Sequence, residues 1–181
     1  PAPVAKAPRW PLPIPVRLGL VGGDGAIVPF RLSDDAPYLD DQVILVNGKT
    51  HLQPISPASS GKIVPSLLRN FSAPVILKDD LSSSERLHLM AHDADMFNRW
   101  DAAQTLLVDQ ILAIADDPKH GVDETAIAAL AKAYANSLAN PDLLDMFKSG
   151  LLTLPAISAL ESRMTPAAPV AFFHTRRGVE A

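Results

Sequence analysis

The uneven distribution of proline is the feature that most constrains this 181-residue chain. Residues 1–80 contain 12 of the 17 prolines, whereas residues 81–181 contain 5. Because proline removes a backbone donor and breaks helix interiors, long helices are expected only in the second part. That part is also acidic, with 8 Lys or Arg residues against 13 Asp or Glu residues. The contrast predicts a β module over residues 1–80 followed by an all-α module over residues 81–181.

The first module has the pattern of a small antiparallel sandwich. Val16, Leu18 and Leu20 alternate with polar or small residues, which is the period of a half-buried strand. Further short strands are predicted at AIVPFR (26–31), QVILV (42–46), KIVPSLL (62–68) and PVILK (74–78). The Asn-Gly pair at 47–48 is typical of a hairpin turn after the third of these strands. Several short strands over about 70 residues favour a β-sandwich.

The second module has the pattern of short helices. Ser82 and Glu85 stand at capping-box spacing and predict the start of the first helix. Later helices are predicted at about 97–115, from about 123, from 140 to 150, within 152–164 and within 166–177. Short helices with short loops predict antiparallel helix pairs in a right-angled stack or a solenoid, although the sequence has no repeat of fixed period.

Composition excludes several classes of protein. The absence of Cys excludes disulfide scaffolds, Cys-ligated zinc and thiol nucleophiles, and cytoplasm is the expected location. The formal net charge of −4 argues against a dedicated nucleic-acid-binding protein. No run of residues approaches the roughly 20 apolar residues of a membrane span, so no membrane partner is expected.

The candidate catalytic residues do not form a complete set. His88 and His92 stand four residues apart, as two zinc ligands do on a metallopeptidase helix. The hydrolytic motif H-E-x-x-H needs a Glu as general base, but Leu89 occupies that position. We therefore interpret the pair as ordinary histidines on a helix flank, with adventitious metal binding or a small metal-dependent enzyme as the alternatives.

Serines and paired aspartates also lack a catalytic context. Ser59-Ser60 and Ser82-Ser83-Ser84 stand where loops or caps are expected, without a nucleophile elbow around them. The adjacent aspartate pairs, such as Asp79-Asp80, lie in polar or turn-forming surroundings. The sequence thus predicts no catalytic, cofactor-binding or metal-binding residue in this chain.

The densest polar and aromatic string surrounds Trp100. Arg99 and Asp101 flank this side chain near the start of a predicted helix. The string is interpreted as a charge-assisted pair that fixes the boundary between the modules, or alternatively as a ligand-binding aromatic patch. We favour the boundary, and expect Trp100 to be buried there.

Several strings together resemble bacterial aminopeptidase N, the alanyl aminopeptidase branch of the zinc metallopeptidases. FSAPV at 71–75 follows Leu67-Leu68-Arg69, and RWDAAQ at 99–104 comes about two dozen residues later. PLPIPVRLGLVGGDGAIVP (11–29) and LTLPAISALES (152–162) agree in order, so the resemblance covers about residues 11–175.

The resemblance implies an Ig-like β-sandwich over residues 1–80 and the start of an α-helical superhelix over residues 81–181. It implies a parent enzyme that uses zinc to remove N-terminal residues from peptides. The family's H-E-x-x-H and G-x-M-E-N motifs do not occur here, so this chain alone is expected to be inactive. It also implies that Phe71, Arg99, Trp100 and Asp101 are structural residues of the domain junction. The implied partners are the catalytic domain and the remaining helices of the parent.

The alternative is a free-standing Ig-like and helical module that binds a protein partner. The chain opens with Pro and ends in RRGVEA, which we interpret as the edges of a segment from a longer protein. The apolar string from Pro169 to Phe173 is expected to be exposed once later helices are missing. Exposed apolar area favours association, so the isolated chain is expected to form dimers or larger species.

Overall fold

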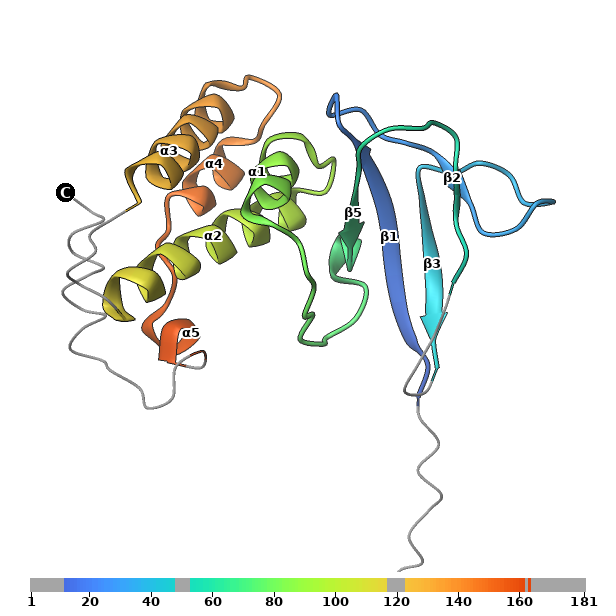
Figure 1. Cartoon of the computed structure of the whole chain (residues 1–181), viewed down its shortest axis with the longest axis horizontal. Coiled ribbons are helices and arrows are strands. Elements are labelled where there is room, and N and C mark those ends of the chain that lie inside the picture. Colours follow the sequence, from blue (N-terminus) through green and yellow to red (C-terminus); the bar gives the residue numbers. More distant parts are fainter. Residues whose placement is uncertain (1–11, 48–52, 117–122, 162, 164–181) are drawn as a thin grey trace, which may run out of the picture.

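A computed structural model describes residues 12–47, 53–116, 123–161 and 163. Strands gather on one side of the molecule and helices on the other (Figure 1). Within these ranges, five strands form two antiparallel sheets. The larger sheet has the order β3-β1-β5 and consists of β1 (Ile14–Gly22), β3 (Asp41–Val46) and β5 (Ile63–Leu67). The smaller sheet pairs β2 (Phe30–Arg31) with β4 (Ser56–Pro57). The β module consists of two small antiparallel sheets, as the sandwich pattern predicted.

The second half of the central strand β1, from Leu18 to Gly22, is buried on both faces. Leu18 and Leu20 pack in one buried cluster with Val28 and with Phe30 of β2. Val21 projects from the opposite face, because side chains alternate along a strand, and packs against the helices. Alternation therefore gives the sandwich its own core and leaves one row of side chains for contact with the helical module.

Two strand predictions need correction. In the predicted strand 26–31, only Phe30 and Arg31 form a strand, and Ile27 makes a single bridge to Val21. Pro29 supplies no N–H, which limits ladder pairing there. The strand predicted at 74–78 is wrong: it pairs with no strand in the described part, and the Ile76 side chain is 91% exposed. The predicted hairpin turn falls at the start of residues 48–52, which lie outside the described ranges, and β3 pairs with β1.

The helices start largely where the caps predict. They are α1 (Ser83–His92), α2 (Met96–Asp116), α3 (Glu124–Ala139), α4 (Asp145–Leu151) and α5 (Ile157–Glu161). The capping box of α1 is formed: Glu85 N donates to Ser82 Oγ at 3.3 Å, and Ser82 N donates to Glu85 Oε2 at 2.8 Å. The helix predicted within 166–177 lies outside the described residues.

The fourth helix begins later than predicted. Asn140 accepts a hydrogen bond from Asp142 N on its side-chain oxygen at 2.9 Å, and Leu143 N donates to its carbonyl at 3.4 Å. These bonds close a turn at Asn140-Pro141, and the helix starts only at Asp145. Asparagine competes for backbone donors through its own side chain, which explains why the pair forms a turn before the helix.

One hydrophobic cluster spans the two modules. Val21 and Val64 from the sheet pack in the same buried cluster as Leu89, Met90 and Ala103 from α1 and α2. Contacts between α1 and β5 and between α2 and the short 3₁₀ turn after β5 close the boundary. No helix in the described part of the chain is long and apolar enough to span a bilayer.

Candidate functional site: the junction between sheet and helices

A buried ion pair crosses from the sheet to the helices. Arg69 opens the 3₁₀ turn η1 (Arg69–Phe71) directly after β5, and Asp93 caps the C-terminal end of α1. Arg69 Nη2 donates to Asp93 Oδ1 at 2.6 Å, and the two side chains are 4% and 0% exposed. Arg69 Nε also donates to Ser66 Oγ at 3.0 Å. The guanidinium is thus fixed by one partner in each module.

Gly19 makes room for this guanidinium. It lies on β1 opposite Ser66, and a Cβ atom at Gly19 would overlap the guanidinium of Arg69. A glycine inside a strand is unfavourable by itself and often marks a close approach by another group. Here the approaching group is the Arg69 side chain, which lies directly on the backbone of the central strand.

A second set of hydrogen bonds ties the start of α2 to the end of β5. Asp95 Oδ1 accepts from Asn98 N at 3.0 Å, which caps the helix, and Asp95 Oδ2 accepts from Asn70 N at 2.7 Å. Asn98 Nδ2 donates to Ser66 Oγ and to Leu67 O, both at 2.8 Å. Asp95 therefore both caps α2 and binds the turn after β5, and Asn98 connects α2 to β5.

The backbone of the connecting turn is strained. Leu68, Asn70 and Phe71 have φ of 57°, 53° and 52°, in the left-handed region that non-glycine residues rarely adopt. Such residues cost on the order of 1–3 kcal/mol each and persist only when the surroundings hold them. The bonds of Arg69 to Asp93 and of Asn70 to Asp95 supply that restraint.

An aromatic contact lies beside the polar bonds. The rings of Phe71 and Phe97 meet edge to face with centroids 5.3 Å apart, and Phe97 lies 5.8 Å from the ring of Trp100. Phe71 belongs to η1 and Phe97 to α2, so this pair also spans the two modules. Trp100 is partly buried, rather than fully buried as expected, and packs against the shared core.

The pair predicted between Arg99 and Asp101 is not formed. Arg99 is 8% exposed and lies over the ring of Phe147 in α4, 5.9 Å from its centroid. Burial lowers the pKa of Arg99, although the nearby charge of Asp93 acts in the opposite direction. Asp101 is exposed. Residues 99 and 101 are two positions apart and therefore do not share a helix face. Arg99 thus connects α2 to α4 within the helical module.

The two histidines of α1 take part in the fold. His88 Nε2 donates to the carbonyl of Gly22 at 2.7 Å, and its ring lies 4.8 Å from that of His92. Burial and the charges of His88 and Arg99 lower the pKa of His92, against the effect of Asp24. Over the described ranges, no group of three or more His, Asp or Glu residues is placed to hold a metal ion. The described residues do not fit a zinc site.

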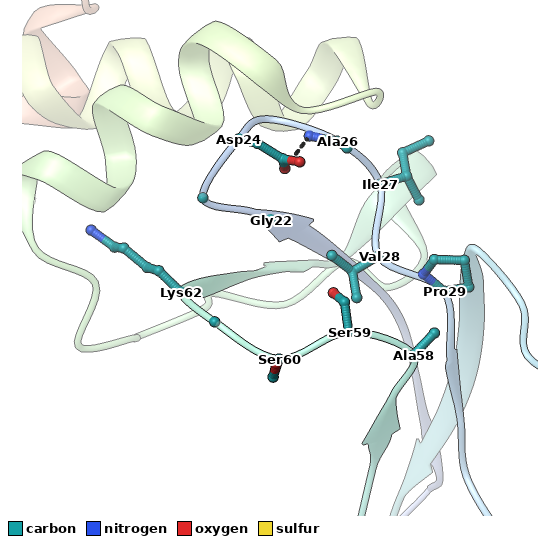
Figure 2. Close-up of a pocket in the computed structure, with 12 residues that line it drawn as sticks. Gly22, Asp24, Ala26, Ile27, Val28, Pro29, Ala58, Ser59, Ser60 and Lys62 are labelled. Carbon is teal, nitrogen blue, oxygen red and sulfur yellow. Dashed lines mark hydrogen bonds between the residues drawn. The ribbon is translucent and has the colours of Figure 1, made fainter.

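The serines at 59 and 60 line a hollow of about 500 Å³ between the turn after β1 and the loop before β5. Figure 2 shows Asp24 turned back on Ala26, whose N–H it accepts at 3.0 Å, and the ammonium of Lys62 extending away from Ser59. The lining includes no histidine or second carboxylate that could activate a serine. The hollow has no set of catalytic groups.

The sequence alone does not identify Arg69, Asp93 and Asn98 as junction residues. Two signals of the junction are nevertheless present in it: Arg69 precedes the FSAPV string, and Gly19 interrupts a strand pattern. Neither signal reveals its role until its partner is known, because Arg69 binds Asp93 and Gly19 contacts Arg69.

Both modules of the chain match known proteins. Residues 2–80 match a family model described as a domain of unknown function (DUF3458) with an Ig-like fold, and residues 83–181 match its DUF3458_C counterpart, described as ARM repeats. Aminopeptidase N of Caulobacter vibrioides is 41% identical over 114 residues, covering 62% of this chain and 13% of that protein. Aminopeptidase N of Escherichia coli K12 is 26% identical over 184 residues, covering 99% and 20%.

A solved structure shows the same arrangement. Legionella pneumophila aminopeptidase A, crystallised in complex with aspartic acid, matches with a TM-score of 0.72 and 26% identity. The match covers 93% of this chain and 18% of that one. The chain therefore spans a fifth or less of the length of these relatives.

Proposed function

Because the chain belongs to the family that joins the DUF3458 Ig-like domain to the DUF3458_C ARM-repeat domain, and matches segments of Aminopeptidase N proteins, we propose that it is a non-catalytic segment of a zinc-dependent aminopeptidase. In this proposal the segment spaces the helical domain from the catalytic domain and sets the angle between them. The catalytic groups and the zinc belong to the rest of the parent chain. The parent acts on peptides in the cytoplasm.

The observation that carries the proposal is the buried Arg69–Asp93 pair. An exposed linker between two domains permits relative motion, whereas a shared core and a fully desolvated ion pair favour one arrangement. An apolar contact alone would be enough to bury surface between the modules. The chain instead desolvates two charges and holds a strained turn in place at this boundary. Buried hydrogen bonds between polar groups specify one packing geometry, so these residues are explained if they fix the angle between the sheet and the helices.

A fixed angle has a consequence for an enzyme. Helices held over an active site restrict entry to chains thin enough to pass, and they exclude water and folded proteins. The junction would thereby contribute to substrate selection without contacting the substrate.

The test uses the full-length protein that contains this segment, with Asp93→Ala as the loosened variant. We expect hydrolysis of an alanyl amide and the zinc content to stay near wild type, because the catalytic groups are untouched. The ratio of cleavage at the N-terminus of a folded protein to cleavage of the amide should rise. Asp109→Ala, which removes an exposed partner of Arg163, serves as control. An unchanged ratio in a variant whose junction is demonstrably loosened would refute the spacing role.

A further inference from the structure

The surface beside the junction is apolar. Phe71 is 60% exposed and Phe97 is 39% exposed, and the two rings are in contact. We call these two side chains the aromatic ledge. The chain continues from the ledge into an exposed apolar run at 75–77, in which Ile76 is 91% exposed. Exposed apolar clusters of this kind mark interaction surfaces.

The ledge is held in place by the fold. Phe71 has a φ of 52°, a conformation that an unrestrained phenylalanine avoids. The neighbouring Arg69 and Asn70 bind Asp93 and Asp95, so the turn cannot relax and withdraw the ring from the surface. Backbone strain that holds an apolar ring in solvent favours a role for that ring outside this chain.

A hollow of about 380 Å³ adjoins the ledge, and its lining includes Phe97, Met96, Asp41 and Asp95. Arg69 also lines it, but Asp93 neutralises that charge. Asp41 is one-third exposed, and over the described residues its ion pair with Arg17 runs through Oδ1, at 3.4 Å, so Oδ2 is available to a second cation. The hollow therefore combines an available carboxylate with an aromatic ring, which suits a Lys or Arg side chain.

We propose that the aromatic ledge and this hollow form the docking surface for a segment of the remaining aminopeptidase chain that presents a Lys or Arg beside apolar side chains. The inference rests on the proposed function. Its choice of partner follows from two observations. At least four-fifths of the length of the relatives lies outside the matched segment. The ledge also draws one ring from each module, so a partner bound there would lock the same angle that the Arg69–Asp93 pair sets.

Hydroxyl-radical footprinting tests this on two samples, the 181-residue chain at a concentration where it is monomeric and the full-length protein that contains it. Oxidation of Phe71 and Phe97 should fall at least about fivefold in the full-length protein, as for residues at the centre of an interface. Tyr38, 46% exposed and away from the junction, should stay unchanged, and Met90, 0% exposed, should stay protected in both samples if the short chain is folded. Equal oxidation of the ledge in both samples would overturn the proposal.

Variants of the full-length protein give an independent reading. Asp41→Lys should restore oxidation of Phe71, whereas Asp34→Lys, which breaks the comparable surface pair with Arg31, should not. If Phe71 stayed protected from oxidation in the Asp41→Lys variant, the proposed Lys or Arg of the partner segment would be refuted. Ledge protection in the short chain that grows with concentration would instead assign the surface to a second copy. An alanyl amidase assay separates the two proposals: inactive wild-type full-length protein would refute the function, whereas an active one with an unprotected ledge would refute only the docking surface.

Discussion

At the scale of single residues, Asp93 matters because it is the carboxylate partner of a buried cation. Its Oδ1 accepts from Arg69 and from the backbone N–H of Asp95, and its Oδ2 is buried without a partner in the described structure. Arg69 has no other carboxylate within ion-pair distance over the described residues. Loss of either side chain therefore leaves the other charge buried and uncompensated.

We predict that Asp93→Ala lowers the free energy of unfolding by about 3–5 kcal/mol, the usual cost of breaking a buried pair from one side. Asp109→Ala breaks an exposed pair with Arg163, with both side chains 47% exposed, and should cost less than about 1 kcal/mol. Urea denaturation of the two variants measures both values. Equal losses would mean that the Arg69–Asp93 pair is no more buried than a surface pair.

Gly19 offers a second test at the same scale. Gly19→Ala should lower the free energy of unfolding by about 1–3 kcal/mol, because the new methyl group displaces the Arg69 guanidinium. Gly150 lies in α4, where a Cβ atom would have no neighbour within 4 Å, so Gly150→Ala should stabilise by about 0.5–1 kcal/mol. Thermal melts measure both effects, and a shift of Tm in the same direction for both variants would show that the Arg69 guanidinium does not fill the space above Gly19.

At the scale of elements, α1 depends on its N-terminal cap. The helix presents Leu89 and Met90 to the shared core and His88 to the sheet, so its position matters to both modules. Ser82 and Glu85 satisfy each other's backbone donors at its first turn. We expect Ser82→Ala to lower the free energy of unfolding by about 1 kcal/mol. Ser83→Ala changes an exposed neighbour that is not the cap, and it should cause no measurable change.

The cap also predicts a pH dependence. Hydrogen bonds from the side chain and backbone of Ser82 lower the pKa of Glu85 below 4.5. The stabilisation from this carboxylate is therefore fully present above pH 4.5 and is lost as the pH falls through the lowered folded value. Denaturation between about pH 5 and pH 2 should show a shallower loss of stability in Ser82→Ala than in the wild type. Parallel curves would show that the carboxylate is not bonded in solution.

At the scale of the whole molecule, the apolar surface left on the helical module predicts association. Leu144, Met146 and Leu152 on and beside α4 are 60%, 81% and 62% exposed. Repeat arrays cover such faces with the next repeat. The string from Pro169 to Phe173, expected to drive association, lies outside the described residues.

Light scattering of the isolated chain should give dimers or larger species at high micromolar concentration. Met146→Lys should reduce the apparent mass, because it puts a charge in the middle of the exposed face, whereas Tyr38→Lys on the β module should not. A wild-type chain that stays monomeric would contradict association through this face.

The sequence was sufficient for what depends on local pattern. Alternation located β1, the Ser82 and Glu85 spacing located α1, and the proline distribution predicted the order of a β module followed by a helical one. It was insufficient where two distant segments must meet. Arg69 and Asp93 are 24 residues apart, and their pairing depends on which face of β5 meets α1. The same limit explains the strand wrongly predicted at 74–78, since its apolar residues fit a strand but no neighbouring strand in the described part pairs with them.

Whether this segment is non-catalytic can be measured on the purified 181-residue chain, by assaying hydrolysis of an alanyl chromogenic amide with added zinc and by determining the bound zinc. We expect no turnover and no stoichiometric zinc, because His88 is bonded to the sheet and the described residues offer no third ligand. Turnover accompanied by one bound zinc per chain would contradict this expectation, and would place His88 and His92 in an active site.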